Sequence, residues 1–212
     1  ALHELRRNAL EVLHEQLVQL VIKLSLSDRL QPPPVALLEA LDSSAAALGQ
    51  RGQMALARNP EEPWRQWVNL IIARLPEAGQ PRQPWQYRSS SEAVADLQFL
   101  AEQLNVVGAQ RLVLNDLQPV IRSVQSLGFH SAVLDIRQNS KFHDLAVEQL
   151  LQAAGFSDYQ FSSWSEEQRL ELLNRELQSA RPFAHPSLEL GNEASAVRDC
   201  YRVLADEIAQ HG

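Results

Sequence analysis

The segment from Phe129 to Arg137 constrains the fold most, because its apolar residues recur at every second position. Alternating residues define two faces: Ala132, Leu134 and Ile136 on one, and Val133, Asp135 and Arg137 on the other. This period is typical of a β-strand. The backbone N–H and C=O groups of a strand need partners, and the sequence contains no obvious second segment of this kind. Any fold must therefore accommodate a lone strand among helices.

Helical periodicity dominates the remaining chain. Apolar residues recur at intervals of three and four, which predicts about eight helices. Capping residues, prolines and glycines bound them, as in the asparagine–proline start at Asn59 and the capping box of residues 165–168. The predicted helices are Leu2–Leu24, Val35–Leu48, 59–76, 89–108, 116–128, 140–155, 165–181 and Glu193–Ala209. The predicted fold class is therefore mainly α, with one strand.

A loop divides the predicted helices into two groups. Residues 77–88 contain prolines at 81 and 84 and have no apolar periodicity. Such a segment is typical of a loop or of a joint between subdomains. We therefore expect an N-terminal helical part over residues 1–76, a loop or joint over 77–88, and a second part over 89–212. In that second part, helices surround the strand segment Leu134–Gln138.

The composition argues against several partners. The net charge is −7 and the basic residues are scattered, which argues against nucleic acid. The longest apolar cluster, Leu17–Leu26, is too short and too polar to cross a membrane. A single cysteine, Cys200, cannot form an internal disulfide, which favours a reducing cytoplasmic location. The chain begins at Ala1 within a helical pattern, which suggests a piece of a longer protein.

Candidate chemistry gathers at the end of the predicted strand. Side chains two residues apart on a strand are neighbours, so Asp135 can orient the guanidinium of Arg137 toward a planar anion such as carboxylate or phosphate. His143 falls in the first turn of the following helix, close to Arg137 and Gln138 if the connection is short. The alternatives are a buried ion pair that ties strand to helix, and a structural histidine.

Motifs for other chemistry are incomplete or missing. The His14-Glu15 pair begins a metalloprotease pattern, but Val18 stands where the second histidine ligand should be. No cysteine and histidine cluster has zinc spacing, and no glycine-rich phosphate loop occurs. We therefore predict neither a metal ligand nor a catalytic nucleophile in this chain.

The segment Leu134-Asp135-Ile136-Arg137-Gln138-Asn139-Ser140, followed by His143, resembles the Leu-Asp-Ile-Arg-Gln-Glu-Ser…His segment of phosphoenolpyruvate carboxylases. The similarity is strong from about Leu97 to Pro182. It is weaker upstream, around Leu24–Ser27 and Glu62–Arg65. Further matching residues are Trp164–Glu167, Leu172–Leu177 and Arg181-Pro182.

This resemblance implies a fold and a reaction. Family members are several times longer and form an α/β barrel surrounded by helices, of which this chain would be a piece. They join bicarbonate to phosphoenolpyruvate with a divalent metal, usually Mg²⁺, and release phosphate and oxaloacetate. The reaction is carried out by a carbon–carbon lyase that replenishes the tricarboxylic acid cycle.

The resemblance also implies roles for individual residues. Arg137 would bind the substrate phosphate at the C-terminal end of a barrel strand, and Asp135, Gln138 and His143 would support it. Asn139 stands where many members have glutamate. The family's catalytic histidine motif, metal-binding carboxylates and glycine–arginine loop have no counterpart here.

These expectations define two alternatives. In the first, the chain is part of a carboxylase, is inactive alone, and has the rest of the parent enzyme as its partner. Isolated from the barrel, its strand edge would cause self-association or would become extended coil. In the second, the chain is a self-standing, non-catalytic helical module that serves as a scaffold or binds an anion.

Overall fold

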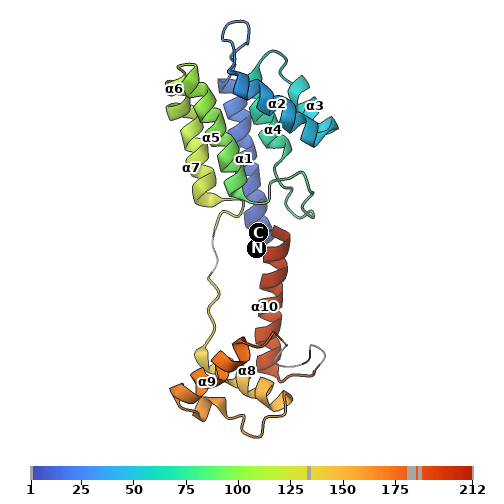
Figure 1. The fold of residues 1–212 in the computed structure, drawn as a ribbon, viewed down its shortest axis with the longest axis vertical. Coiled ribbons are helices and arrows are strands. Elements are labelled where there is room, and N and C mark those ends of the chain that lie inside the picture. The colour runs from blue at the N-terminus through green and yellow to red at the C-terminus, as the bar shows by residue number, and fades with distance from the viewer. Residues whose placement is uncertain (1, 133–134, 181–184, 186–187, 212) are drawn as a thin grey trace. The chain divides into compact units, whose positions relative to one another are not determined.

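The computed structural model describes residues 2–132, 135–180, 185 and 188–211, and helices dominate it (Figure 1). The mainly α class predicted from the sequence is therefore confirmed. Within the described ranges no residue belongs to a β-strand. The helices are α1 (Leu2–Lys23), α2 (Val35–Leu48), α3 (Gln50–Ala57), α4 (Pro63–Ala73), α5 (Ser90–Val106), α6 (Gln110–Leu112), α7 (Gln118–Leu127), α8 (Ser140–Ala153), α9 (Glu166–Leu177) and α10 (Asn192–His211).

The chain forms two compact units. Unit 1 consists mainly of residues 1–133 and contains α1 to α7, and unit 2 consists of residues 134–209. The loop of residues 77–88 lies within unit 1, and the division between the units falls at residues 133 and 134. No helix of the described residues is long and apolar enough to cross a membrane.

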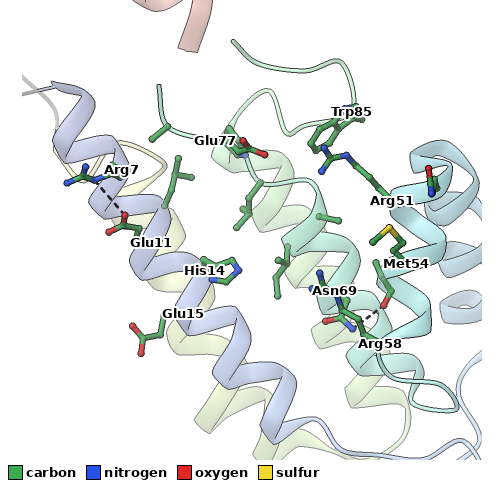
Figure 2. A pocket seen from close by; sticks show the side chains of 18 residues that line it. Arg7, Glu11, His14, Glu15, Arg51, Met54, Arg58, Asn69, Glu77 and Trp85 are labelled. Atoms are coloured by element: carbon green, nitrogen blue, oxygen red, sulfur yellow. Dashed lines mark hydrogen bonds and ion pairs between the residues drawn. The ribbon is translucent and has the colours of Figure 1, made fainter. Parts of the chain in front are cut away.

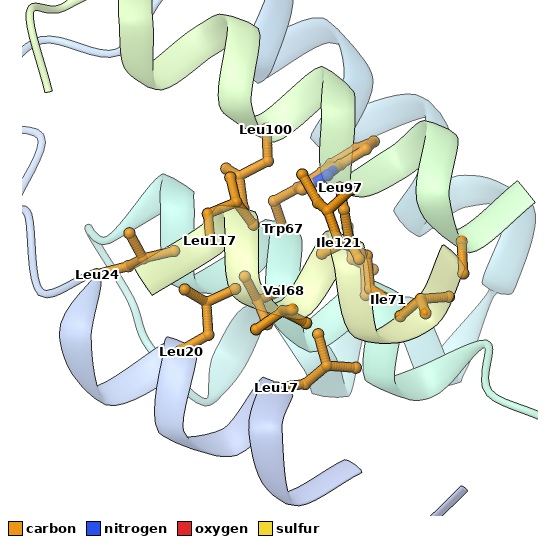
Figure 3. Close-up of a cluster of buried hydrophobic side chains, with 14 of the residues drawn as sticks. Leu17, Leu20, Leu24, Trp67, Val68, Ile71, Leu97, Leu100, Leu117 and Ile121 are labelled. Carbon is orange, nitrogen blue, oxygen red and sulfur yellow. The ribbon is translucent and has the colours of Figure 1, made fainter. Parts of the chain in front are cut away.

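Helix α4 is central to unit 1, where it contacts α1, α2, α3 and α5. Its apolar residues recur at intervals of three and four and face the core, where most of them are buried and Ile72 and Ala73 are partly buried. The side chains of α1, α5 and α7 close around this face (Figure 3). The core residues labelled in Figure 3 are Leu17, Leu20, Leu24, Trp67, Val68, Ile71, Leu97, Leu100, Leu117 and Ile121.

The C-terminal end of α1 is fixed to α4 by Arg65. The last carbonyl groups of a helix have no partner within the helix. The guanidinium of Arg65 donates from Nε to the Val21 carbonyl at 2.7 Å and from Nη2 to the Ile22 carbonyl at 3.2 Å. It also pairs with Glu62 at 2.8 Å. One side chain therefore caps α1 and joins it to the start of α4.

Helices α2 and α3 are joined at Gly49 and pack closely. A Cβ atom on Gly52 would lie 2.3 Å from the Ala45 carbonyl oxygen. The sequence predicted that the second helix ends near Gly49 and did not predict α3. Gly52 is buried inside α3. A glycine is required at this position, because only a residue without a side chain permits this approach of the two backbones.

Two helix starts differ from the sequence prediction. The expected start at Asn59 is a turn in which Glu61 has a φ of 62°, and α4 begins at Pro63. Asp116, the aspartate at which the predicted helix of residues 116–128 begins, lies inside a π-helical turn, η1 (Val113–Leu117), which connects α6 to α7 without a break. The helix therefore begins at Gln110, earlier than the aspartate signal indicated.

The loop of residues 77–88 is fixed to unit 1 by Tyr87, whose side chain is 1% exposed. Its hydroxyl donates to Asp96 Oδ2 at 2.6 Å, and Arg74 Nη1 donates to the same oxygen at 2.7 Å. The Arg74 guanidinium also lies over the Tyr87 ring, 4.2 Å from its centroid. Burial raises the pKa of the Asp96 carboxyl and raises that of the Tyr87 phenol well above its usual value.

Unit 2 has a much smaller apolar core. Helix α8, the 3₁₀ turn η2 (Phe161–Ser163) and α9 meet around Leu151, Phe161 and Leu172. The predicted capping box at the start of α9 is present, with Ser165 and Gln168 bonded reciprocally. The Gln149 side chain connects α8 to the first turn of α10 by accepting the Ala194 N–H at 2.9 Å. Packing in this unit therefore depends strongly on polar contacts.

Candidate functional site

The predicted strand is not shown by the structure. Phe129 and His130 form a turn after α7, in which the His130 N–H donates to the Leu127 carbonyl at 3.3 Å. Val133 and Leu134 lie outside the described residues. Residues 135–139 belong to neither helix nor strand. A strand requires a neighbour for its backbone groups, and among the described residues no segment pairs with this one.

Asp135 and Arg137 form the ion pair that their spacing predicted. Arg137 Nη2 lies 3.1 Å from Asp135 Oδ2. The Arg137 side chain is 87% exposed and the Asp135 side chain 73%, so the alternative of a buried ion pair does not hold in this structure. An exposed pair contributes little to stability. Within the described part of the chain Asp135 is the one partner of Arg137, which leaves most of its five N–H donors available.

The arginine stands directly before the N-terminus of α8. The Asn139 side chain caps this helix by accepting the Lys141 N–H at 3.0 Å, and it lies one residue before the predicted helix of residues 140–155. Asparagine is one of the best N-cap residues. The residue that departs from the family pattern therefore has a local role in starting the helix.

The structure places all four predicted site residues around this helix start. Asp135, Arg137 and Gln138 lie in the exposed segment before Asn139, and His143 is half-buried at the beginning of α8. A helix N-terminus carries a partial positive charge and unpaired N–H groups. An arginine beside it therefore creates an environment that favours an anion. Sequence reasoning missed Asp144 in the same turn, because its partner is 25 residues away on α9.

A cavity with a volume of about 1000 Å³ lies elsewhere, within unit 1 (Figure 2). Helices α1, α3 and α4 and the loop of residues 77–88 form its walls. Among the labelled charged groups, Arg7 pairs with Glu11, and the Arg51 guanidinium lies 4.0 Å from the centroid of the Trp85 ring. None of the four predicted site residues lines this cavity.

Comparison with known proteins identifies the family. The family model described as phosphoenolpyruvate carboxylase matches residues 1–212. The chain belongs to the phosphoenolpyruvate carboxylase family. A phosphoenolpyruvate carboxylase of Azorhizobium caulinodans is 33% identical over 213 residues and one of Rhodothermus marinus is 32% identical over 206 residues. The alignments cover 93% and 95% of this chain but 22% of each relative. The chain thus spans about a fifth of the length of these carboxylases.

The divalent metal that the carboxylase family implies requires a cluster of ligands. Within the described residues no group of three or more histidine, cysteine, aspartate or glutamate side chains is arranged to hold a metal ion. Mg²⁺ binds through carboxylate oxygens and water, and the exposed Asp135 is already paired with Arg137. The described residues therefore do not fit a metal site.

Proposed function

We propose that this chain is a segment of a phosphoenolpyruvate carboxylase and that it contributes Arg137 to the binding of the substrate phosphate. The complete enzyme would join phosphoenolpyruvate to bicarbonate and release oxaloacetate and phosphate. The observation that carries the proposal is the family match over residues 1–212. Because the chain spans 22% of the relatives, the metal site and the catalytic histidine would come from other segments.

The geometry around Arg137 supports this role. A guanidinium binds phosphate best through two parallel N–H donors. The exposed Arg137 has such donors, and its ion pair with Asp135 restricts its orientation. Gln138 is also exposed, and the nearby start of α8 favours negative charge. In the complete barrel we expect the predicted strand, Phe129 to Arg137, to pair with neighbouring strands, which would hold the arginine at a strand end.

Substitution of Arg137 in the full-length protein tests the assignment. We expect both Arg137→Lys and Arg137→Ala to raise the KM for phosphoenolpyruvate strongly, since lysine retains the charge but not the forked donors. The matched control is Arg175→Lys, which alters an exposed arginine of the same unit that pairs with its neighbour Glu176 at 3.2 Å. A wild-type KM in the Arg137→Lys variant would contradict the phosphate assignment.

The isolated chain should have no carboxylase activity. One phosphate-binding arginine cannot replace a metal ion and a group that transfers protons. The measurement is oxaloacetate formation by residues 1–212 with phosphoenolpyruvate, bicarbonate and Mg²⁺, compared with a reaction without protein. Oxaloacetate above that control would show that the chain carries more of the catalytic machinery than we propose.

The second candidate function is a self-standing helical module. One observation favours it: unit 1 encloses a continuous buried core of its own. Such a module would remain monomeric at high concentration and would bind little hydrophobic dye. It would also bind a simple anion such as inorganic phosphate without converting phosphoenolpyruvate.

A further inference from the structure

Arg169 of α9 connects three separate parts of unit 2. Its Nη1 lies 3.4 Å from Asp144 Oδ2 near the start of α8. Its Nε donates to the Trp164 carbonyl at 3.2 Å, and its Nη2 donates to the Ser162 carbonyl. The guanidinium also lies over the Phe161 ring, 5.1 Å from the centroid. One half-buried side chain therefore joins α9, the turn before it and the beginning of α8.

The contact with Asp144 is close to the proposed phosphate site. Asp144 is adjacent to His143 and lies four residues after Ser140, so it is about 6 Å along the helix axis from the first residue of α8. The direction of this first turn determines where the cap Asn139 lies, and hence where residues 135–138 leave the helix. Because an α-helix is stiff over one turn, a fixed Asp144 fixes the start of the helix.

The small core of unit 2 makes this connection important. In the described part of unit 2 the buried residues of that core are Leu151, Phe161 and Leu172, and Phe161 lies beneath the Arg169 guanidinium. A second link between the 3₁₀ turn and α8 exists, because the Ser162 N–H donates to Glu148 Oε1 at 2.9 Å. Glu148 lies one helical turn further along α8. Loss of Arg169 would therefore release the start of α8 while the later part of the helix stayed attached.

We propose that Arg169 is a positioning residue for the phosphate-binding segment, acting through Asp144 on the first turn of α8. This inference rests on the proposed function of Arg137. Arg169 holds the helix start in the direction that presents the Arg137 guanidinium to the substrate phosphate, and it does not touch the substrate. Its fork suits this task, since it bonds a carboxylate and two carbonyl groups at once.

The test uses the full-length protein with the variants Arg169→Met and Asp144→Asn. We expect each to raise the KM for phosphoenolpyruvate about tenfold, because small misplacements of a binding group reduce its effect strongly. The KM for bicarbonate should stay unchanged. The double variant should be no worse than Arg169→Met alone, since the two side chains act through one contact. Arg169→Lys should restore part of the affinity, because lysine can still pair with Asp144.

Controls separate positioning from a loss of folded protein. Arg175→Met removes an exposed arginine from the same helix and should leave both KM values unchanged. A purely structural role for Arg169 would lower the amount of active enzyme, and hence Vmax, without changing the KM for phosphoenolpyruvate. If Arg169→Met does not fold, Asp144→Asn removes only the ion pair and gives the same readout.

The outcomes also distinguish this inference from the function on which it rests. A raised KM in Arg137→Ala together with an unchanged KM in Arg169→Met and Asp144→Asn would overturn the positioning role alone. An unchanged KM in Arg137→Ala would remove the phosphate assignment and the positioning role together. The expected result is a raised KM for phosphoenolpyruvate in Arg137→Ala, Arg169→Met and Asp144→Asn. The KM values of Arg175→Met should equal those of the wild type.

Discussion

Tyr87 is a buried phenol whose pKa should make unit 1 sensitive to alkali. Burial, with the negative charge of Asp96 as a further cause, raises the pKa of Tyr87 well above 10.0 in the folded chain. A group with a raised pKa contributes its full stability below its unfolded pKa and loses it as the pH rises toward the folded value. The unfolded chain then loses the phenolic proton first, which favours unfolding.

We therefore predict that the free energy of unfolding falls above pH 10, by up to about 1.4 kcal/mol per pH unit. Tyr87→Phe should be less stable at pH 8, because it loses the bond to Asp96, but should show a smaller alkaline decrease. Urea denaturation at pH 8 and pH 10.5 measures both effects. Tyr159→Phe is the control, since Tyr159 is 38% exposed in unit 2. Equal alkaline slopes for Tyr87→Phe and the wild type would contradict the prediction.

The sequence predicted local residue contacts better than distant ones. The Asp135–Arg137 pair follows from a spacing of two residues, and its presence could be predicted. Its exposure could not, because burial depends on which other segments cover a residue. Arg65, Arg74 and Arg169 were not predicted as structural residues, because their partners lie 22 to 44 residues away in the chain.

At the scale of helices, Gly52 sets the distance between α2 and α3. We predict that Gly52→Ala lowers the free energy of unfolding by about 1–3 kcal/mol, because the new methyl group would overlap the Ala45 carbonyl. This loss is the net change. The overlap with the Ala45 carbonyl outweighs the gain of about 1 kcal/mol that alanine gives over glycine in a helix. The measurement is urea denaturation. The control is Gln53→Ala on the exposed face of α3, which should be neutral or slightly stabilising. A Gly52→Ala variant as stable as Gln53→Ala would contradict the prediction, because it would show that the two helices can move apart without lowering the free energy of unfolding.

Helix bodies followed the apolar pattern, whereas helix starts were harder to predict. The buried faces of α1, α4 and α5 were predicted, since period and burial agree there. Asn59 and Asp116 carry good start signals but are overridden by packing. The Asp28 N–H donates to the Glu61 carbonyl at 2.9 Å and stabilises a turn where the asparagine–proline pair predicted a helix. Local propensity is a weak signal when a distant segment supplies the hydrogen bond.

At the scale of the whole molecule, the two units differ in the size of their cores. Among the described residues of unit 2 the buried cluster has three members, so the stability of this unit should be no more than about 3–5 kcal/mol. We predict that unit 2 unfolds at a lower urea concentration than unit 1. Of the four tryptophans, Trp164 belongs to unit 2 and the others belong to unit 1. Trp164→Phe should therefore remove the first transition from fluorescence but not from circular dichroism. A single transition seen by both methods would contradict the prediction.

The exposed apolar residues of α9 lead to a prediction about association. Leu170, Leu173 and Leu177 recur at helical spacing, and their exposed fractions are 51%, 40% and 81%. We predict that the chain self-associates at high concentration through this face. Size-exclusion chromatography with light scattering over a dilution series measures it. Leu173→Glu should reduce the association, whereas Val106→Glu, which alters an exposed position of unit 1, should not. A monomer at every concentration would contradict this prediction.

The division into units was not evident in the sequence. The loop of residues 77–88 has the composition of a joint, yet Tyr87 and Gln86 bury its end against unit 1. The division at residues 133 and 134 falls inside the segment with the strand pattern, where no loop signal occurs. A strand pattern indicates how a segment pairs in a sheet, and it does not indicate where one compact unit ends.

The independent core of unit 1 has a consequence for the order of events during translation. The segment of residues 134–209 takes roughly 4–15 s to synthesise at about 5–20 residues per second. Helical units with mostly local contacts fold in microseconds to milliseconds. Unit 1 can therefore complete its core before α9 has left the ribosome. During those seconds Arg137 would be attached to a finished N-terminal unit, while α9, which carries the residue proposed to orient Arg137, could not yet pack against α8.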